Sequence, residues 1–228
     1  MDTIYKQKPL LYNTCSMIVS GVSRSGKTDF VIRLLHNLDT AFYEGRPAKI
    51  LYCYKRMQDK LFVLEKDVPG LVLHEGLPSS DTLDEFSSSN KGELLVILDD
   101  LIFLAVNSAT VADLFTSGRH SNISIIFITQ NIFEKGLYSR TITLNAMYIV
   151  LFNNIRDRTQ ISRFASQVYQ QPRLKDFMRI YDTAMLRQFN YLLMDFHPYS
   201  DNTFRLRNNL LGELGEEINV FEITEKAI

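Results

Sequence analysis

Cysteine is scarce in this chain, and its scarcity bears on the environment in which the protein folds. Cys15 and Cys53 are the two cysteines among 228 residues, and each lies in an apolar stretch. Such thiols are more typical of buried, reduced cysteines than of a disulfide. The four histidines are scattered, without the spacing of zinc ligands. The sequence therefore argues against a disulfide-rich scaffold and against a zinc finger.

Long apolar runs and an excess of charge are also missing. No stretch reaches the roughly 18 apolar residues that a membrane-spanning helix needs. The first residues, MDTIYKQKPL, contain no apolar signal-peptide core. We therefore expect a protein that is neither secreted nor inserted in a membrane. The formal net charge is −1, so any surface that binds nucleic acid must be a local basic patch.

Apolar runs alternate with segments of helical periodicity along most of the chain. This alternation is typical of an α/β protein with a mostly parallel central sheet flanked by helices. Strands are expected at 15–21, 49–54, 70–75, 93–100, 123–131, 146–152, 190–196 and 203–207. Helices are expected at 28–38, 79–89, 108–118, 157–169 and 173–188. We expect residues 1–207 to form a single domain and residues 208–228, which are rich in glutamate, to form a solvated acidic tail.

A glycine-rich segment connects the first expected strand to the first expected helix. Its sequence fits the pattern G-x-x-x-x-G-K-[ST] and consists of Gly21, Val22, Ser23, Arg24, Ser25, Gly26, Lys27 and Thr28. Glycines let backbone N–H groups turn toward phosphates, and the N-terminus of the following helix adds its positive dipole end. In this pattern Lys27 contacts the β- and γ-phosphates, and the Thr28 hydroxyl coordinates Mg²⁺. We interpret the segment as a nucleotide-binding loop rather than a chance glycine-rich turn.

Polar side chains end two of the later apolar strands. Asp99 is expected at the C-terminal edge of the sheet, where α/β proteins bind their ligands, and it would hold Mg²⁺ together with Thr28. Asp100 would orient or deprotonate the attacking water, although an adjacent acid pair can also be a solvated turn. Gln130 suits a sensor of that water or of the γ-phosphate, although a strand-end glutamine can also cap a loop.

The order of these segments along the chain predicts the order of their strands in the sheet. The loop comes first, the acid pair second and Gln130 third, and we expect the Gln130 strand to lie between the other two. That arrangement is typical of motor-type ATPases and not of nucleotide kinases. In ring-forming ATPases an arginine from a neighbouring subunit stabilises the charge that develops on the γ-phosphate. The candidates for this role are Arg119, Arg140, Arg156 and Arg158.

Four segments together carry a more specific signal than the loop alone. They are MIVSGVSRSGKTDFVIRLL, LLVILDD, SGRHSNISIIFITQNIF and LNAMYIVLFNNIRDRTQI. In this combination they resemble the genome-packaging ATPases of the FtsK–HerA superfamily, above all those of double-jelly-roll DNA viruses and of polinton-like or adintovirus-like elements. The resemblance covers most of residues 10–170 and includes the EGLP turn at 75–78.

The resemblance implies a P-loop NTPase of the RecA/FtsK-like, additional-strand type that hydrolyses ATP with Mg²⁺. It implies a motor that moves double-stranded DNA into a preformed viral capsid, working as a homo-oligomeric ring, a hexamer or pentamer, at a capsid vertex. Such a motor acts inside an infected host cell or in association with the virion. The usual trans-acting arginine of the superfamily lies just upstream of the sensor strand, which favours Arg119. Asp100 stands where most cellular motors have Glu, and Val22 and Arg24 stand where relatives tend to have Pro and Gly.

Two other functions remain open at this point. A P-loop nucleotide kinase or small-molecule kinase would carry an arginine-rich lid and an acceptor pocket, and neither is evident in the sequence. A non-catalytic ATP-binding capsid assembly factor would lack the water-activating acid at position 100. The residues that would contact DNA are not identified, because the basic residues at 55, 56, 60, 205 and 207 are more consistent with an ordinary solvated surface than with a DNA site.

Overall fold

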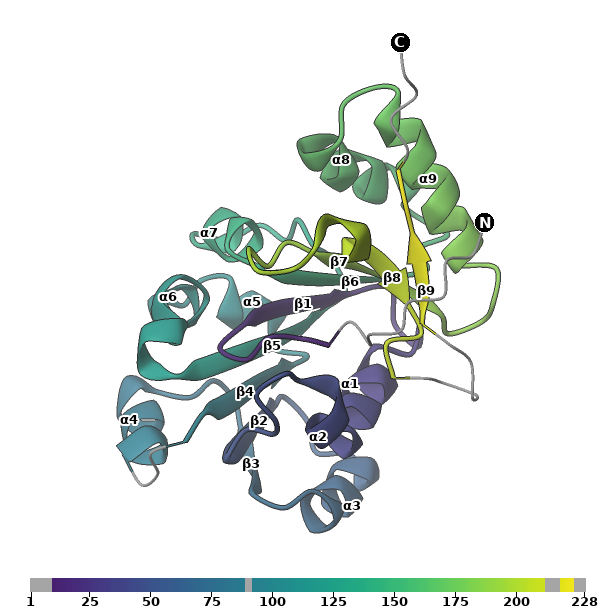
Figure 1. The fold of residues 1–228 in the computed structure, drawn as a ribbon. Helices are drawn as coiled ribbons and strands as arrows, with labels where there is room; N and C mark the ends of the chain where they lie inside the picture. Colours follow the sequence, from purple (N-terminus) through teal and green to yellow (C-terminus); the bar gives the residue numbers. More distant parts are fainter. Residues whose placement is uncertain (1–9, 89–91, 212–217, 224–228) are drawn as a thin grey trace.

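A single nine-stranded sheet runs through the computed structural model, which describes residues 10–88, 92–211 and 218–223 (Figure 1). The order of its strands is β3-β2-β4-β5-β1-β6-β7-β8-β9. The strands are β1 (Ser16–Ser20), β2 (Lys49–Tyr54), β3 (Leu71–Glu75), β4 (Leu94–Asp99), β5 (Ile123–Thr129), β6 (Tyr148–Phe152), β7 (Tyr191–Asp195), β8 (Leu206–Asn208) and β9 (Asn219–Phe221). The first six are parallel to one another, and β7, β8 and β9 continue the sheet in antiparallel pairs. The expected α/β fold with a mostly parallel sheet is confirmed.

Helices connect the strands and cover both faces of the sheet. They are α1 (Lys27–His36), α2 (Leu38–Ala41), α3 (Asp59–Asp67), α4 (Ser80–Ser88), α5 (Ile102–Ala105), α6 (Ala109–Ser117), α7 (Ser139–Leu144), α8 (Arg158–Val168) and α9 (Arg173–Ala184), with 3-10 helices η1 (Gly118–Ser121) and η2 (Asn202–Phe204). The helix expected at 28–38 is interrupted at Asn37, and the short helices α3, α5 and α7 were not expected. None of the helices in the described ranges is long and apolar enough to cross a bilayer.

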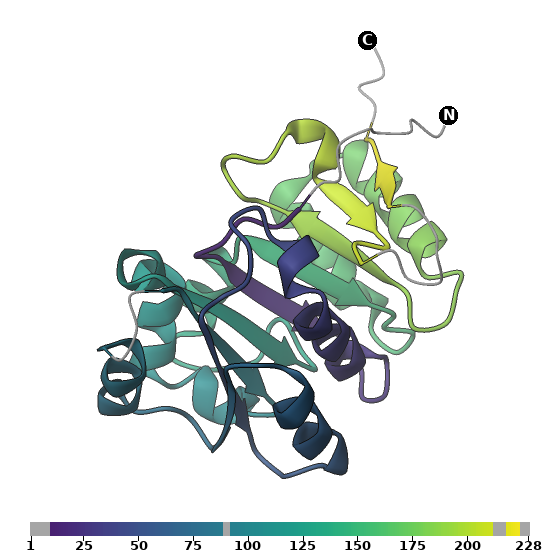
Figure 2. The same cartoon turned by 60° about the horizontal axis from the view of Figure 1, so that its bottom comes forward.

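The sheet divides the hydrophobic core into two halves. Met17 and Val19 of β1 pack on one side with α1, α2 and α3, whereas Ile18 packs on the other side with residues of α4 to α9. Figure 2 shows α1 and α3 in front of the sheet. Because β4 and β5 are buried on both faces, their sequences are continuous apolar runs and do not alternate with polar residues.

The strand order agrees with the order expected for motor-type ATPases. β5 pairs with β4 on one side and with β1 on the other, in parallel register throughout. The strand that ends before Gln130 therefore separates the strand that ends at Asp99 from the strand that leads into the glycine-rich loop. The carboxyl ends of the three strands lie side by side at one edge of the sheet.

The C-terminal residues do not match the expectation of a solvated tail that begins at residue 208. Asn208 ends β8, Leu210 is buried, and Asn219–Phe221 form the edge strand β9. Pairing with β9 satisfies backbone groups of β8 that would otherwise form an open sheet edge. The tail residues 212–217 and 224–228 lie outside the described residues, and the division of the chain at residue 207 stays a prediction.

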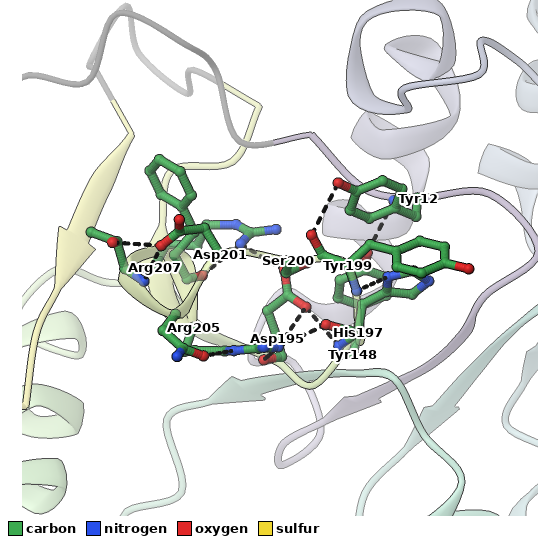
Figure 3. A network of polar contacts seen from close by, with 12 residues as sticks. Tyr12, Tyr148, Asp195, His197, Tyr199, Ser200, Asp201, Arg205 and Arg207 are labelled. Atoms are coloured by element: carbon green, nitrogen blue, oxygen red, sulfur yellow. Dashed lines mark hydrogen bonds and ion pairs between the residues drawn. The ribbon is translucent and has the colours of Figure 1, made fainter.

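A buried ion pair joins the antiparallel strands β7 and β8 at the end of the sheet opposite the glycine-rich loop (Figure 3). Asp195 lies opposite Tyr148, the first residue of β6, and its Oδ2 accepts hydrogen bonds from Arg207 Nη1 and Ser200 Oγ, both at 2.8 Å. The His197 backbone N–H donates to Asp195 Oδ1 at 2.9 Å, and the His197 ring stacks on Tyr12. Arg207 is only 1% exposed, so it is not part of a DNA-binding surface.

Arg207→Met tests the contribution of this pair to stability. The substitution removes the closer of the two arginines that pair with the buried carboxylate of Asp195 and leaves only Arg205 Nη1, which lies 4.0 Å from Asp195 Oδ1, so we expect the free energy of unfolding to fall by about 3 kcal/mol. Arg158→Met is the matched control, because it removes a largely exposed pair with Asp182 at 2.7 Å and should cost less than about 1 kcal/mol. Chemical denaturation measures both values, and equal losses would contradict the assignment.

Candidate functional site

The glycine-rich loop lies between β1 and α1, and both of its glycines are required by the local geometry. A Cβ atom at Gly21 would come within 2.5 Å of Phe152 Cβ on β6, so a larger residue would push the two strands apart. Gly26 has a φ of 102° at the start of α1, in the left-handed region that side chains other than glycine rarely adopt. The residues between them are placed differently, with Ser23 and Arg24 exposed and Val22 and Ser25 partly buried.

Lys27 places its ammonium group inside the curve of the loop. The side chain is 8% exposed, and Nζ donates a hydrogen bond to the Val22 carbonyl oxygen at 2.8 Å. Burial lowers the pKa of Lys27, while the charges of Asp99 and Asp100 raise it. Ser25 Oγ is also buried and has no hydrogen-bond partner within the described residues. The loop thus presents a desolvated cation and a free hydroxyl, which suit an anionic ligand.

Asp99 ends β4 as a buried carboxylate held by two hydroxyl groups. Tyr52 Oη on the neighbouring strand β2 donates to Asp99 Oδ2 at 2.8 Å, and Thr28 Oγ1 lies 3.4 Å from the same oxygen. Burial raises the pKa of Asp99, and the hydrogen bond from Tyr52 partly opposes that effect. A hydroxyl and a carboxylate that meet in this way are hard oxygen ligands of the kind that Mg²⁺ prefers. The donor set therefore fits the metal ligands expected from the sequence.

Asp100 is the first residue beyond β4 and is oriented differently from Asp99. It is exposed and has a φ of 57°, so the chain turns sharply directly after the strand. Non-glycine residues with such a backbone cluster at functional sites, where the surrounding structure maintains the strain. The turn allows adjacent acids to have separate environments, one buried beside Thr28 and one open to solvent.

A cavity of about 180 Å³ brings the expected site residues together at the carboxyl edge of the sheet. Residues from the neighbouring strands β4 and β5, from the loop and from the segments that follow the strands line it, namely Ser23, Arg24, Lys27, Thr28, Gln58, Asp99, Asp100, Ile102, Ile128, Thr129 and Gln130. The structure thus places the proposed phosphate ligands, metal ligands, water-orienting acid and sensor around one space. Gln58, which precedes α3, was not expected there.

The segment that carries Gln130 is held by hydrogen bonds on both sides. The Asn131 backbone N–H donates to Thr129 Oγ1 at 3.2 Å, and Asn131 Oδ1 accepts from Gln160 Nε2 of α8 at 2.6 Å. Asn131 Oδ1 also accepts from the Phe133 backbone N–H at 2.9 Å. These contacts fix the end of β5 and leave the Gln130 side chain exposed toward the cavity.

Arg119 lies far from this cavity in its own chain. It is an exposed residue of η1, directly before β5, whereas Gln130 directly follows that strand. β5 has seven residues, and at about 3.3 Å per residue it separates its two ends by roughly 20 Å. Arg156 lines a second cavity beside the loop, and Arg158 pairs with Asp182. Arg140 lies on α7 and is exposed.

Tyr52 is a site residue that the sequence did not reveal. It reaches Asp99 because β2 and β4 are adjacent and because Tyr52 lies two register positions before the residue opposite Asp99, which leaves both side chains on the same face. Nothing in the sequence indicates which strand lies on the other side of the acid strand from the Gln130 strand, and a tyrosine in an apolar strand resembles any other core residue. The partner of Asp99 could be found only after the strand order was known.

Comparison with known proteins gives a family and a fold. Residues 75–205 match the family model described as Poxvirus A32 protein, a range that contains Asp99, Asp100, Arg119 and Gln130 but not the glycine-rich loop. No relative was found among curated protein sequences.

The structure is similar to that of the genome packaging NTPase B204 from Sulfolobus turreted icosahedral virus 2. The complex of that protein with AMP has a TM-score of 0.55, 14% sequence identity, and coverage of 82% of this chain and 96% of that chain. Its complexes with ATP-gammaS and AMPPCP each have a TM-score of 0.54 at the same identity, covering 82% of this chain and 95% and 96% of that chain. At this level of identity the likeness establishes the P-loop NTPase fold.

Tyr52→Phe tests whether the tyrosine hydroxyl orients Asp99 for metal binding. Residues that hydrogen-bond to a metal ligand without contacting the metal typically contribute about 10- to 100-fold to metal affinity. We therefore expect the Mg²⁺ concentration for half-maximal nucleotide hydrolysis to rise by about tenfold or more, with nucleotide binding in EDTA unchanged. Tyr54→Phe, two residues along the same face of β2, is the control. An identical Mg²⁺ response in both variants would exclude the role.

Proposed function

The chain belongs to the poxvirus A32 protein family, whose model matches more than half of it, and from this premise we propose an ATP-hydrolysing motor that moves double-stranded DNA into a viral capsid. The resemblance to packaging ATPases is confirmed at the level of the family, and the implied fold at the level of the structure. The observation that carries the proposal is the cavity that joins Lys27, Thr28, Asp99, Asp100 and Gln130 at the ends of β1, β4 and β5.

In the proposed reaction the loop binds the triphosphate of ATP. Its backbone N–H groups and the N-terminus of α1 face the phosphates, and Lys27 exchanges its contact with the Val22 carbonyl for the β- and γ-phosphate oxygens. Thr28 and Asp99 would hold Mg²⁺, which when bound supplies positive charge to the β- and γ-phosphate oxygens. The buried, positively charged loop thereby orients the γ-phosphate toward the acid strand.

Asp100 and Gln130 are proposed to handle the attacking water. The Asp100 carboxylate accepts a hydrogen bond from the water and then its proton, while the Gln130 amide fixes the water or a γ-phosphate oxygen. The water oxygen bonds to the γ-phosphorus as the bond to the bridging oxygen breaks, which releases ADP and phosphate. Asp100 suits this role because it is exposed to the cavity, whereas Asp99 is buried against Tyr52 and Thr28.

Arg119 is proposed to act on the nucleotide of a neighbouring subunit. Its position at the opposite end of β5 excludes contact with the cavity of its own chain. Each contact in a head-to-tail ring, pentameric or hexameric, joins two different surfaces of neighbouring subunits. Such a ring would bring the end of one subunit's sheet that carries Arg119 to the opposite end of the next subunit's sheet, which carries the cavity. The ring would dock at a capsid vertex in an infected cell, or on the virion, with DNA in its channel.

The two alternatives receive less support from the structure. In nucleotide kinases the loop strand and the acid strand are usually neighbours, whereas β5 lies between them here. A non-catalytic assembly factor has no need of a water-activating acid, and Asp100 lines the cavity. For DNA contacts, Lys55 and Arg56 are exposed after β2. Lys60 pairs with Asp29 at 3.4 Å.

ATP hydrolysis with and without double-stranded DNA, measured together with particle size, tests the proposal. We expect hydrolysis to rise several-fold with DNA, in a ring-sized species. Lys27→Ala should lose nucleotide binding. Asp100→Asn should still bind ATP but should hydrolyse it at least about 100-fold more slowly than wild type, because it lacks the general base. Phosphate transfer to a nucleoside or nucleotide in place of water would overturn the motor assignment. Normal turnover by Asp100→Asn would remove Asp100 from the mechanism.

Mixing experiments test the trans role of Arg119. Arg119→Ala subunits should bind ATP as tightly as wild type, because the residue is remote from its own site, yet lower the hydrolysis rate of wild-type subunits mixed with them. Arg163→Ala, which alters an exposed arginine of α8 that is not a candidate for this role, serves as the control. If the mixed rate equals the weighted mean of the separate rates, the trans-acting arginine lies elsewhere.

A further inference from the structure

A second, larger cavity of about 550 Å³ adjoins the glycine-rich loop on the side away from the acid strand. Three chain segments form it: residues 22–25 of the loop, residues 153–156 after β6, and residues 187–190 before β7. Its volume lies in the range of small-molecule sites, about 300–1,000 Å³. Apart from the loop and Gln130, its residues take no part in the proposed hydrolysis.

The two cavities share part of their lining around the loop. Ser23, Arg24 and Gln130 line both of them, so a ligand whose phosphates occupy the first cavity can extend into the second. Their chemistry differs, since the first contains Lys27 and two carboxylates. Among the described residues that line the second cavity there is no carboxylate. It presents the apolar side chains of Ile155 and Phe189 together with three arginines, Arg24, Arg156 and Arg187.

Phe189 has a conformation and an exposure that stability does not explain. Its φ is 62°, a backbone conformation that is costly for a bulky residue. Its ring is nevertheless 55% exposed, so the protein gains little from burying it. The side chain lies against the loop, because a Cβ atom built on Gly26 would be 3.3 Å from Phe189 Cβ. Ile155, which also lines the cavity, is 83% exposed. An exposed aromatic ring in a strained turn beside a phosphate loop suits a flat ligand.

We propose that the second cavity holds the nucleoside part of the nucleotide, with the aromatic base packed on Phe189 and Ile155. The side-chain amides of Asn153 and Asn190 also line the cavity and are available to the ribose hydroxyls. Arg24 lines both cavities. A nucleotide bound in this way would have its α-phosphate, which joins the sugar to the other phosphates, beside this unusual loop residue. The inference rests on the proposed function, because it assumes that the loop binds a nucleoside triphosphate.

Binding of two probes separates the nucleoside cavity from the phosphate cavity. The probes are AMPPCP, which carries a base, and inorganic triphosphate, which carries none, both titrated calorimetrically with Mg²⁺. Base–aromatic stacking contributes about 1–3 kcal/mol per base, which corresponds to about 5- to 100-fold in Kd. Phe189→Ala should therefore weaken AMPPCP by about 5- to 100-fold and leave triphosphate unchanged.

Further variants distinguish a selective loss of base binding from misfolding and from nonspecific effects of a substitution. Phe189→Gly suits the positive φ of the turn and should show the same selective loss, whereas Phe189→Tyr keeps the ring and should bind AMPPCP as wild type does. Leu186→Ala is the matched control, because Leu186 is 81% exposed in the same turn and does not line the cavity.

The outcomes distinguish a failure of this inference from a failure of the proposed function. If wild type binds both probes and the Phe189 variants bind AMPPCP equally tightly, the nucleoside cavity is wrong and the ATPase proposal stands. The nucleoside cavity is also wrong if Leu186→Ala weakens AMPPCP as much as Phe189→Ala, or if the Phe189 variants change only the assembly state. If wild type binds neither probe, both proposals are overturned.

Discussion

The parallel pairing of β4, β5 and β1 is the constraint on which the candidate site depends. Parallel strands in register end at the same edge of a sheet, and here each of the three ends in a polar group or a loop. Asp99, Gln130 and the glycine-rich loop are far apart in the sequence, yet this pairing leaves them around one cavity. Gly21, directly after β1, lies close to Phe152 of the neighbouring strand β6, and this contact fixes the loop beside β6.

Burial gives the charges of the site their chemical character. Lys27 and Asp99 are both buried and carry opposite charges. Burial lowers the pKa of Lys27 and raises the pKa of Asp99, so it favours the neutral form of each group. The charge of Asp99 raises the pKa of Lys27, and the hydrogen bond from Tyr52 lowers the pKa of Asp99, so each effect favours the ionised form of the group concerned. A bound phosphate and a divalent cation would supply the missing partners of these charges. Asp100, one residue further along, is exposed and is therefore free to interact with water.

The two edges of the sheet have different roles. The carboxyl edge of the parallel strands carries both cavities beside the loop. The opposite edge carries Arg119 in η1 and the buried pair of Asp195 and Arg207, which ties β7 and β8 together (Figure 3). The proposed trans role of Arg119 requires a residue that cannot reach the cavity of its own chain, and Arg119 lies at the end of β5 opposite that cavity.

The parallel strands, the glycine-rich loop and the acid pair could be predicted from the sequence, because each of these is a local feature. A strand that is buried on both faces must be a continuous apolar run, and a phosphate loop must place glycines at fixed spacing. Local patterns were insufficient for α3, where the run Leu61–Leu64 of four apolar residues hides the helical period. They were also insufficient for β9, a three-residue strand in an acidic segment.

Contacts between side chains across strands and turns could not be predicted in this way, because they depend on the tertiary structure. Tyr52 contacts Asp99 because β2 lies beside β4, and Phe189 lies against the loop because β7 pairs with β6. Arg207, a basic residue near the end of the chain, is buried by its pairing with Asp195 and is not part of the surface. Residue type and spacing carry no record of such contacts, since they depend on the order of strands in the sheet and on the direction of each connection.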